Sequence, residues 1–492
     1  MRRNPTIRLG DLASTDFPLS PEAAAVEITG LSSNSRAVQP GFLFAALKGG
    51  SVDGVRFAPD AVMQGAVALL CAADSSLAAD PGVPVLRAAD PRIALARFAA
   101  RFYPRQPEKL VAVTGTAGKT SVAVFARQIF TAAGHAAASI GTIGIVAPSG
   151  SEYGSLTTPD PIALHAALDR LARAGVSHTA LEASSHGLDQ RRLDGVRLVA
   201  AGFTNLGRDH MDYHPTVEDY FAAKMRLFAE ILPEGASAVI DADGPFAERV
   251  ATIAGDRGQR IIRVGVAGEG IRLRSARADG LHQVLELDVF GELMTVDLPL
   301  AGAFQASNAL VAAGLAIAAG VAPAEAIRAL ARLEGAPGRL EKVGVTKRGG
   351  AVFVDYAHKP DALDHALSAL RAMTGGRLVV VIGAGGDRDP GKRALMGEVA
   401  TRRADIVIVT DDNPRSEDPA LIRAAVLAGA PGAIEIGDRS RAIAEAVSML
   451  GEGDVLCVAG KGHETGQIVK GVVHPFSDHE AVMAAINAEV AA

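Results

Sequence analysis

Short apolar runs rich in β-branched residues recur along this chain, and each ends at a glycine or a polar turn. A segment with a helical apolar pattern follows most of them. Strands that alternate with helices in this way indicate parallel sheets covered on both faces, so the sequence predicts an α/β fold. The runs are LVAVTG from position 110, LVAAGFTN from 198, SAVIDADG from 237, VFVDYAH from 352, LVVVIGAGG from 378, IVIVTDDNP from 406 and VLCVAGKGH from 455.

The chain of 492 residues is too long for a single core, and domains of ~100–200 residues would give roughly two to four of them. Three domains are predicted, at 1–90, 91–337 and 338–492. The first ends near the proline-rich stretch DPGVPVLRAADPRIA, and the second ends at LEGAPGRLEKV, whose glycines and proline are typical of a linker.

Composition excludes several classes of protein. The formal net charge of −6 argues against a general nucleic-acid binder, which needs a basic excess. Cys71 and Cys457 both stand in apolar runs, so a disulfide framework is not expected. No apolar segment follows the N-terminal arginines as a signal peptide would require, and the stretch ALVAAGLAIAAGVAPA is shorter than a membrane-spanning helix. We therefore expect a cytoplasmic protein without a membrane span.

The sequence VTGTAGKTS, which begins at Val113, has the lysine and hydroxyl of a phosphate-binding loop. The usual spacing G-x-x-x-x-G-K-[ST] is not met, because Gly115 and Gly118 are too close together. A strand is predicted before the loop and a helix after it, so backbone N–H groups would face an anion. Lys119 would then neutralise phosphate charge, and Thr120 would reach Mg²⁺. An ordinary strand-to-helix turn with a solvated lysine is the alternative, and the spacing alone leaves both open.

Lys224 stands on the apolar face of a predicted helix. Thr216 and Asp219 are typical of a capping box at its start. The apolar face is formed by Tyr220, Phe221, Leu227, Phe228 and Ile231. A buried ammonium is costly unless it is paired or neutral, and burial lowers the pKa of a lysine. The side chain could instead extend to solvent along its stem. Lys224 is therefore either a snorkelling lysine or a tightly paired or chemically altered one.

Two polar clusters follow predicted strands. In the second domain, Glu182, Asp209 and His210 could supply oxygen and imidazole ligands to a nucleotide-bound divalent ion. In the third domain, residues of both charge signs should meet at one sheet edge: Arg388, Asp412, Asn413, Arg415 and Glu464. Guanidinium groups suit a carboxylate and carboxylates suit an ammonium, so this cluster favours a zwitterionic ligand. The alternative for each motif is that it is an ordinary turn or a surface ion pair without a ligand.

Taken in order, the motifs of this chain resemble those of the Mur ligases. They are NSRAVQPGFLFAALKG, TGTAGKTS, TTPDP, EASSHGL, NLGRDHMDYH, YFAAKMRLF, GRLEKV, VDYAHKPDAL, GGDRDPGKR, DNPR and GKGHE. This family uses a short G-T-x-G-K-T loop, which accounts for the spacing between Gly115 and Gly118. The resemblance implies a small N-terminal UDP-binding α/β domain, a central parallel-sheet ATPase domain of the P-loop type and a C-terminal Rossmann-like domain.

The resemblance also implies a reaction. It would be the ATP-dependent addition of meso-2,6-diaminopimelate to the D-glutamate γ-carboxylate of UDP-N-acetylmuramoyl-L-alanyl-D-glutamate, through an acyl phosphate, in peptidoglycan precursor synthesis. The DNPR motif is carried by the family members that add meso-diaminopimelate and not by those that add lysine, and Arg415 would bind the distal carboxylate that lysine lacks. Mg²⁺ would be the cofactor, Lys224 would carry a CO₂-derived carbamate, and the enzyme would be a monomer.

Site residues carried over from the family fall into five sets. The UDP-muramoyl-dipeptide set is Ser33, Ser35, Gly50, Ser51, Thr157, Thr158, Ser184, Gln190 and Arg192. The ATP set is Gly115, Thr116, Ala117, Gly118, Lys119, Thr120, Ser121, Asn308, Arg339, Asp355 and His358. The diaminopimelate set is Arg388, Asp412, Asn413, Pro414, Arg415, Gly460 and Glu464. The metal ligands would be Thr120, Glu182 and His210, and the catalytic residues Lys119, Lys224, Glu182 and His210.

The chain departs from the family pattern at five positions, none of which carries a charged group assigned to the chemistry. They are Asn34 for Asp, Ala117 for Asn, Gly207 for Thr, Gln305 for Asn and Lys359 for Thr. Three rival functions stay open: a lysine-adding Mur ligase, a folylpolyglutamate synthetase, and a non-ligase nucleotide-binding scaffold or P-loop NTPase. The UDP-domain motif argues against the folate enzyme, and DNPR argues against lysine.

Overall fold

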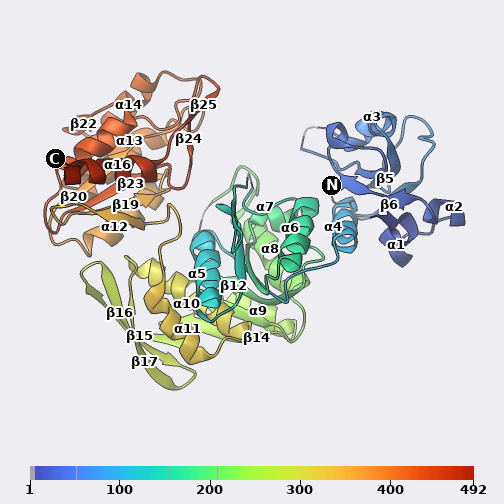
Figure 1. The fold of residues 1–492 in the computed structure, drawn as a ribbon, viewed down its shortest axis with the longest axis horizontal. Coiled ribbons are helices and arrows are strands. Elements are labelled where there is room, and N and C mark those ends of the chain that lie inside the picture. The colour runs from blue at the N-terminus through green and yellow to red at the C-terminus, as the bar shows by residue number, and fades with distance from the viewer. Residues whose placement is uncertain (1–5, 51, 155, 208, 492) are drawn as a thin grey trace. The chain divides into compact units, whose positions relative to one another are not determined.

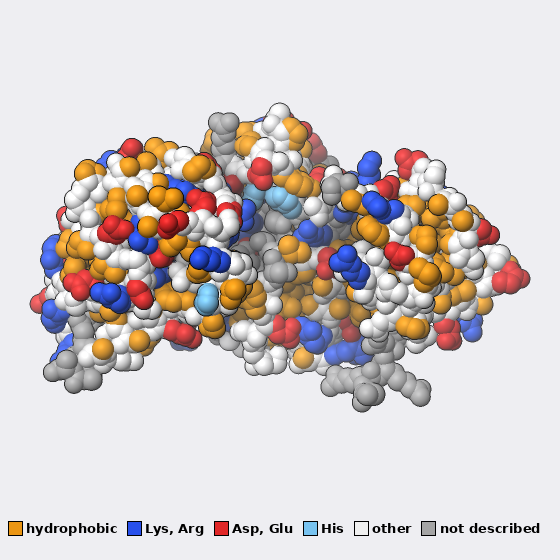
Figure 2. Space-filling model, turned by 90° about the horizontal axis from the view of Figure 1, so that it is seen from above, with side chains coloured by type: hydrophobic (Ala, Val, Ile, Leu, Met, Phe, Trp, Pro, Cys, Tyr) orange, Lys and Arg blue, Asp and Glu red, His pale blue; other side chains and the backbone are white. Residues whose placement is uncertain are grey.

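The computed structural model describes residues 6–491 apart from positions 51, 155 and 208. The chain forms two compact units: residues 1–263 with 314–321, and residues 264–313 with 322–492. Both units contain sheets with parallel strands flanked by helices (Figure 1), as the sequence predicts. On the face shown in Figure 2, basic and acidic side chains are interspersed, which suits a chain with a small net charge. Among the described residues, no helix is both long and apolar enough to cross a bilayer.

The first sheet is a four-stranded parallel sheet of order β3-β4-β5-β6. Its strands are β3 (Gly30–Ser32), β4 (Phe42–Ala45), β5 (Ala66–Ala72) and β6 (Val85–Ala88). Side chains alternate between its faces: Leu43 packs with α1 (Leu9–Ala13) and α4 (Pro91–Phe102), whereas Phe44 packs with α3 (Ala58–Met63). A short helix, α2 (Pro21–Ala24), and the paired strands β1 (Ile7–Arg8) and β2 (Glu27–Ile28) complete this part.

The central sheet of the same unit places β7 between two parallel neighbours, β11 and β12, in the order β10-β9-β8-β11-β7-β12-β13-β14. Its strands are β7 (Lys109–Thr114), β8 (Ala137–Gly141), β9 (Gly144–Ala147), β10 (Gly150–Glu152), β11 (His178–Glu182), β12 (Leu198–Phe203), β13 (Ser237–Asp241) and β14 (Arg260–Gly265). The chain leaves β7 towards β8 on one side and returns to β12 on the other. Ligands of open α/β sheets bind beyond such a reversal of strand order, so the loop after β7 occupies the expected position.

Helices cover both faces of the central sheet. One apolar cluster joins the sheet to α6 (Pro161–Arg173), α7 (Ser185–Asp189), α8 (Val217–Arg226) and α9 (Ala247–Asp256). Helix α5 (Lys119–Ala132) packs on β8 and β11. A π-helical turn at Leu227–Ile231 extends α8.

The second unit begins with three antiparallel strands, β15 (Ile271–Asp279), β16 (His282–Val289) and β17 (Glu292–Leu298). The helices α10 (Ala303–Ala318) and α11 (Pro323–Ala329) follow. A six-stranded sheet then has the order β18-β19-β23-β20-β21-β22, with only β18 antiparallel to its neighbour. Its strands are β18 (Glu341–Val345), β19 (Ala351–Asp355), β20 (Leu378–Ile382), β21 (Ile406–Val409), β22 (Ile434–Glu435) and β23 (Val455–Ala459).

The apolar strands of this last sheet are buried on both faces, which explains their continuous hydrophobic sequences. Phe353 packs with α12 (Pro360–Arg371), α13 (Lys392–Arg403) and α14 (Pro419–Leu427). Val352 and Val354 point the opposite way, onto α15 (Arg439–Ser448) and α16 (Asp478–Ala491). The hairpin β24 (Gly466–Val469) and β25 (Val472–Pro475) follows β23. This two-faced layering is the Rossmann-like arrangement expected for the C-terminal part of the chain.

Candidate active site

The loop between β7 and α5 has the geometry of a phosphate-binding turn. Gly118 is left-handed, with φ +86°, immediately before the first residue of α5. A Cβ atom on Gly115 would lie 1.9 Å from Thr204 Oγ1 at the end of β12, so a side chain cannot fit there. Thr204 Oγ1 in turn donates a hydrogen bond to Ala117 O at 2.6 Å. The backbone path therefore requires glycine at both positions. The loop forms a complete phosphate-binding turn in spite of its short Gly115–Gly118 spacing.

Two lysines donate hydrogen bonds to the same carbonyl of this loop. Lys119 Nζ lies 2.8 Å from Gly115 O and 2.9 Å from Thr116 O. Lys224 Nζ approaches Gly115 O from α8 at 2.7 Å. Its side chain is 1% exposed and lies over the ring of Tyr220, 4.4 Å from the ring centroid. Burial, together with the charge of Lys119, holds the pKa of Lys224 well below its usual value. Lys224 therefore does not extend to solvent.

Glu182 is a buried carboxylate at the carboxyl end of β11, next to the loop. Its Oε2 accepts a hydrogen bond from Thr120 Oγ1 at 3.0 Å. Thr142, in the turn between β8 and β9, donates to both carboxylate oxygens, through its N–H at 2.8 Å and its hydroxyl at 3.1 Å. Carboxylate and hydroxyl oxygens are the donors that Mg²⁺ prefers, so Thr120 and Glu182 fit a nucleotide-bound magnesium ion.

His210 lies in a cluster of aromatic rings that also contains His186 and Tyr220. Its backbone is left-handed, with φ +56°. Its ring centroid is 4.8 Å from that of His186 and 6.2 Å from that of Tyr220. In the described part of the chain, no three His, Cys, Asp or Glu side chains form a group that could hold a metal ion. Magnesium commonly takes one or two protein carboxylates and completes its shell with phosphates and water, so a protein cage is not required. The assignment of His210 as a ligand stays a prediction.

The predicted muramoyl-dipeptide residues of the central domain form one hydrogen-bonded network beside Glu182. Thr158 Oγ1 donates to Glu182 O at 2.7 Å and lies 3.0 Å from Ser184 Oγ. Arg192 donates to Thr158 O at 2.6 Å and to Gln190 Oε1 at 2.7 Å. Thr157 Oγ1 lies 3.0 Å from Thr142 Oγ1. The structure therefore brings these five residues, from three segments of the sequence, into one network that contacts Glu182 and Thr142.

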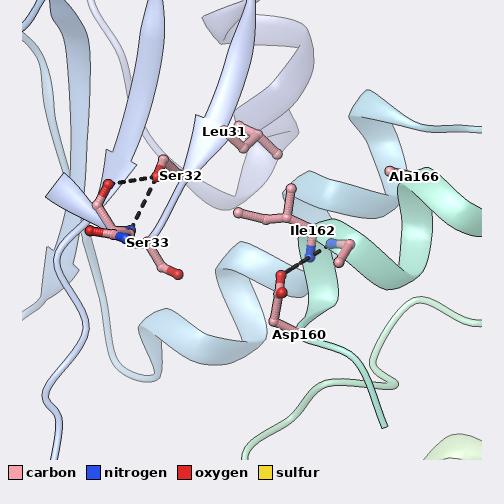
Figure 3. A pocket seen from close by; sticks show the side chains of 8 residues that line it. Leu31, Ser32, Ser33, Asp160, Ile162 and Ala166 are labelled. Carbon is pink, nitrogen blue, oxygen red and sulfur yellow. Dashed lines mark hydrogen bonds between the residues drawn. The ribbon is translucent and has the colours of Figure 1, made fainter. Parts of the chain in front are cut away.

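Ser33 lines a pocket of about 260 Å³ between the first sheet and the start of α6 (Figure 3). Asp160 forms the opposite side, and its Oδ1 caps α6 by accepting hydrogen bonds from Ile162 N at 3.0 Å and Ala163 N at 3.1 Å. Asn34, which replaces the usual Asp of the family, caps the short turn Ser35–Ala37 through a hydrogen bond from Arg36 N at 3.1 Å. The substitution of Asn for Asp thus keeps the local fold.

Gly50, the third predicted contact to the UDP group, is exposed, and a Cβ added to it would meet nothing within 4 Å. Its neighbour Ser51 lies outside the described residues.

The four predicted ATP residues of the second unit are also connected. Asp355, at the end of β19, accepts hydrogen bonds from Leu340 N at 2.6 Å and Ala357 N at 2.8 Å, and burial raises its pKa in spite of the nearby Arg339 charge. The Arg339 guanidinium lies 4.8 Å from the Tyr356 ring centroid. His358 Nδ1 lies 2.9 Å from Tyr356 O, and burial lowers its pKa.

Asn308 reaches this group through the departure at position 305. Asn308 Nδ2 donates to Gln305 Oε1 at 3.2 Å, and Gln305 Nε2 donates to Arg339 O at 3.0 Å. Gln in place of the usual Asn therefore still links Asn308 to Arg339.

All the predicted diaminopimelate residues except Arg388 lie beyond the carboxyl ends of β21 and β23. Asn413 Nδ2 donates to Glu464 Oε2 at 2.9 Å. Gly460 has φ +118°, and a Cβ there would lie 2.6 Å from Asp412 Oδ2. Arg415 has φ +53°, and its Nη1 donates to Gly386 O at 2.8 Å. Pro414, which stands between Asn413 and Arg415 in the sequence, is buried. Arg388 is exposed in the loop after β20. The structure thus joins Asn413 and Glu464 directly.

Lys461 is a residue of this cluster that the predicted sets omit. Its side chain is fully buried, and its Nζ donates to Asn413 Oδ1 at 3.0 Å and to Glu464 Oε2 at 3.2 Å. Asp412 Oδ1 lies 3.9 Å away. A lysine placed directly after an apolar strand, between two glycines in the sequence GKGHE, is the signal that could have identified it. Thr142 was also missed, and nothing in its local sequence marks it as a partner of Glu182.

Comparisons with known proteins agree with this geometry. Three family models match: "Mur ligase family, catalytic domain" at residues 27–103, "Mur ligase middle domain" at 113–316 and "Mur ligase, glutamate ligase domain" at 338–462. A protein of Mesorhizobium japonicum named UDP-N-acetylmuramoyl-L-alanyl-D-glutamate--2,6-diaminopimelate ligase is 58% identical over 486 residues, which cover 99% of this chain and 100% of that protein. One of the same name from Brucella melitensis biotype 1 is 58% identical over 469 residues, 95% of this chain and 96% of its own.

Solved structures show the same fold. A structure titled with that ligase name superposes with a TM-score of 0.74 at 32% identity and covers 99% of both chains. The MurF ligase of Thermotoga maritima in complex with ADP gives a TM-score of 0.60 at 19% identity, covering 94% of this chain and 97% of its own, which supports the fold alone. The three family models, in the order of the predicted N-terminal, central and C-terminal domains, confirm the three-domain architecture. The chain belongs to the Mur ligase family.

Proposed function

We propose that this protein is an ATP-dependent amide ligase that adds meso-2,6-diaminopimelate to the D-glutamate γ-carboxylate of UDP-N-acetylmuramoyl-L-alanyl-D-glutamate, in peptidoglycan precursor synthesis. The observation that carries the chemistry is the pair Lys119 and Lys224 on one carbonyl of the short phosphate loop, beside the buried carboxylate of Glu182. The names of relatives that are 58% identical over nearly the full chain support the choice of substrates. The same reading expects a cytoplasmic monomer.

ATP would bind along Gly115, Thr116, Ala117, Gly118, Lys119, Thr120 and Ser121, with Asn308, Arg339, Asp355 and His358 as the further contacts. The N–H groups of the loop and the N-terminus of α5 favour phosphate oxygens. Lys119 would exchange its bonds to the loop carbonyls for bonds to phosphate oxygens. Thr120, Glu182 and His210 would hold Mg²⁺, which supplies positive charge at the phosphates when it is bound.

The reaction would proceed in two displacements. An oxygen of the D-glutamate γ-carboxylate attacks the γ-phosphorus of ATP, so that an acyl phosphate forms and ADP leaves. The neutral amine of the acceptor then attacks the acyl carbon, and inorganic phosphate leaves from the tetrahedral intermediate with formation of the amide. Lys119 would stabilise the negative charge that develops on the transferring phosphoryl group, and the network around Thr158 would fix the position of the carboxylate.

Lys224 would act as a carbamate. An amine must be neutral to attack CO₂, and the lowered pKa of the buried Lys224 increases the fraction of that form. The nitrogen lone pair bonds to the carbon of CO₂ and the nitrogen loses a proton, which gives an anionic carbamate. An anion at this place would help to fix the cation beside the phosphates. The other interpretation, a neutral lysine that only supports the Gly115 carbonyl, predicts full activity without CO₂.

The acceptor would bind to Arg388, Asp412, Asn413, Pro414, Arg415, Gly460 and Glu464. A guanidinium binds a carboxylate through two parallel hydrogen bonds, and the distal carboxylate of diaminopimelate is the group that lysine lacks. A pocket with an unpaired guanidinium discriminates strongly against a ligand without that carboxylate. The UDP-muramoyl part would contact Ser33, Ser35, Gly50, Ser51, Thr157, Thr158, Ser184, Gln190 and Arg192.

The test measures phosphate release from ATP and Mg²⁺ with UDP-N-acetylmuramoyl-L-alanyl-D-glutamate, with meso-diaminopimelate or L-lysine as the acceptor. The proposal expects release that depends on diaminopimelate, with little release on lysine. Arg415→Lys keeps the charge but removes the planar fork, and should lose most of the preference for diaminopimelate. Equal use of both acceptors by the wild-type protein would point to a lysine-adding ligase, and release without any acceptor would point to a simple NTPase.

A further inference from the structure

Thr142 belongs to none of the ligand sets above, although it makes more hydrogen bonds to the Glu182 carboxylate than any other described residue. Its N–H donates to Oε1 at 2.8 Å, and its hydroxyl donates to Oε2 at 3.1 Å. One residue therefore bonds both carboxylate oxygens, which fixes the plane of the carboxylate group. Thr120 Oγ1, at 3.0 Å from Oε2, holds it from the side of the phosphate loop.

The backbone before Thr142 closes against the same carboxylate. A Cβ atom on Gly141, at the end of β8, would lie 2.0 Å from Glu182 Oε1 and 2.5 Å from its Cδ. Glycine at this position thus permits the close approach that the two hydrogen bonds from Thr142 need. Since Glu182 is only 3% exposed, its side chain has little room for another orientation.

The directions of the hydroxyl hydrogens follow from the partners. An ionised carboxylate can only accept, so the single hydroxyl hydrogen of Thr142 points to Glu182. At the contact of 3.0 Å between Thr142 Oγ1 and Thr157 Oγ1, Thr157 must therefore be the donor. The result is a directed chain of hydrogen bonds that runs from Thr157 through Thr142 to Glu182.

We propose that Thr142 is a positioning residue that orients Glu182 for the divalent cation and couples cation binding to muramoyl-dipeptide binding at Thr157. This inference rests on the proposed function, which places the cation at Glu182 and the substrate at Thr157. Partners that hydrogen-bond a ligating carboxylate orient it, and their loss commonly weakens metal binding about 10–100-fold. Thr142 bonds groups at both proposed ligand sites. Removal of its hydroxyl should therefore reduce the effect that a ligand bound at one site has on the affinity of the other site.

The first experiment measures the binding of Mn²⁺ to the full-length protein by electron paramagnetic resonance, with Mn²⁺ in the place of Mg²⁺ and a non-hydrolysable ATP analogue present. Thr142→Val removes the hydroxyl and keeps the shape and the N–H, and we expect it to weaken Mn²⁺ binding about tenfold or more. Thr142→Ser retains the hydroxyl and should restore binding to within about threefold of wild type. Thr131→Val is the matched control, since the exposed Thr131 hydroxyl donates to Arg127 O within α5 and, among the described residues, to no group of the site.

A second variant keeps the proposal open to refutation if Thr142→Val fails to fold. Gly141→Ala leaves the hydroxyl in place but moves the carboxylate, and should also weaken Mn²⁺ binding about tenfold or more. Wild-type Mn²⁺ affinity in Thr142→Val, or in Gly141→Ala where only that variant folds, would overturn the positioning role.

The second experiment measures coupling by calorimetry, as the ratio of affinities for UDP-N-acetylmuramoyl-L-alanyl-D-glutamate with and without Mn²⁺ and the ATP analogue. We expect a ratio different from one in the wild type, in Thr142→Ser and in Thr131→Val, and a ratio near one in Thr142→Val. An unchanged ratio in Thr142→Val would overturn the coupling role. Failure of the wild-type protein to bind the UDP substrate would instead count against the proposed function, and the Mn²⁺ titration would still decide the positioning role.

Discussion

The Gly115 carbonyl accepts a hydrogen bond from each of two lysines, and this shared partner separates their roles. Lys119 begins α5 and reaches back to its own loop, whereas Lys224 arrives from another helix and is buried. The charge of Lys119 is one cause of the lowered pKa of Lys224. Lys119 thus acts on Lys224 through its charge, which favours the neutral form of the buried amine.

Replacement of Lys224 should separate activity from stability. Lys224→Met should lower the ligase rate about 10²–10³-fold, as the loss of an electrostatic contact to the reacting groups does. The free energy of unfolding should fall by no more than about 1 kcal/mol, because Lys119 still donates to Gly115 O and an apolar side chain suits the buried site. Added bicarbonate should not restore Lys224→Ala, whereas short-chain carboxylic acids should restore part of its rate.

The contribution of Lys224 to the free energy of unfolding depends on pH, and the direction of its pKa shift sets the sign of that dependence. The folded pKa of Lys224 lies below the unfolded one, so between the two values the unfolded chain binds the additional proton. The contribution of Lys224 to stability therefore rises with pH in that window, and Lys224→Met should lack it. Steady-state rates and urea unfolding at several pH values measure both effects, with exposed Lys347→Met as the control. Wild-type turnover in Lys224→Met would exclude the carbamate.

Lys461 gives a second prediction at the scale of one residue. Its ammonium fixes the orientation of the Asn413 amide, whose Oδ1 also accepts from Ile468 N at 2.9 Å. Lys461→Met should raise KM for diaminopimelate about tenfold or more, because Asn413 and Glu464 lose their common donor. It should leave KM for ATP unchanged, and it should lower the free energy of unfolding by about 3 kcal/mol. Equal changes of both KM values, with Lys347→Met at wild type, would show a general loss of structure instead.

At the scale of the element, the turn from β7 to α5 depends on its two glycines, and Gly118 is the one in the left-handed region. Gly118→Ala places a side chain at φ +86°, which costs about 1–2 kcal/mol of folding free energy. Gly134→Ala, at φ +83° after the other end of α5, carries the same backbone strain in open space. We expect similar losses of stability in thermal unfolding but a loss of ATP affinity, by calorimetry, only in Gly118→Ala. Equal ATP affinities in the two variants would show that the loop is not part of the nucleotide site.

At the scale of the whole molecule, buried neutral histidines should make the protein sensitive to mild acid. Burial lowers the pKa of His165, His178 and His463 to about 4. Between that value and about 6.5, the unfolded chain binds more protons, so stability falls as the pH falls through this window. Burial also raises the pKa of three carboxyl groups, to about 6 for Asp241 and above the usual value for Asp194 and Asp355, and these groups act in the opposite sense.

Urea unfolding at pH 7.5, 6.5, 5.5 and 4.5 would measure this loss. His165 is fully buried and should contribute about 3 kcal/mol to it. His165→Gln should flatten the dependence on pH by that amount, whereas replacement of exposed His474 should leave it unchanged. A midpoint that stays constant from pH 7.5 to 4.5 would contradict the assignment of neutral buried histidines.

The α/β class and three-domain order were predictable because apolar period and turn residues are local signals. The phosphate loop, the buried face of α8 and the polar ends of β21 and β23 could be read in the same way. The sequence could not show that Lys224 shares a carbonyl with Lys119, because 109 positions separate it from Gly115. It also did not distinguish a snorkelling lysine from a buried one, since that depends on how closely α8 packs against the loop.

By itself, the sequence determined which residue types end each strand, and through the ordered motifs it determined the family. Only the tertiary structure decided which of those residues touch. Thr142 carries no local mark, and the glycines around Lys461 do not name its partners. Parallel strand pairing places β8 beside β11, and it places β20 between β23 and β21. The loops after β8 and β23 therefore bring Thr142 to Glu182 and Lys461 to Asn413. The physical reason is that hydrogen-bond partners are chosen by distance in space, which strand order sets and local sequence does not.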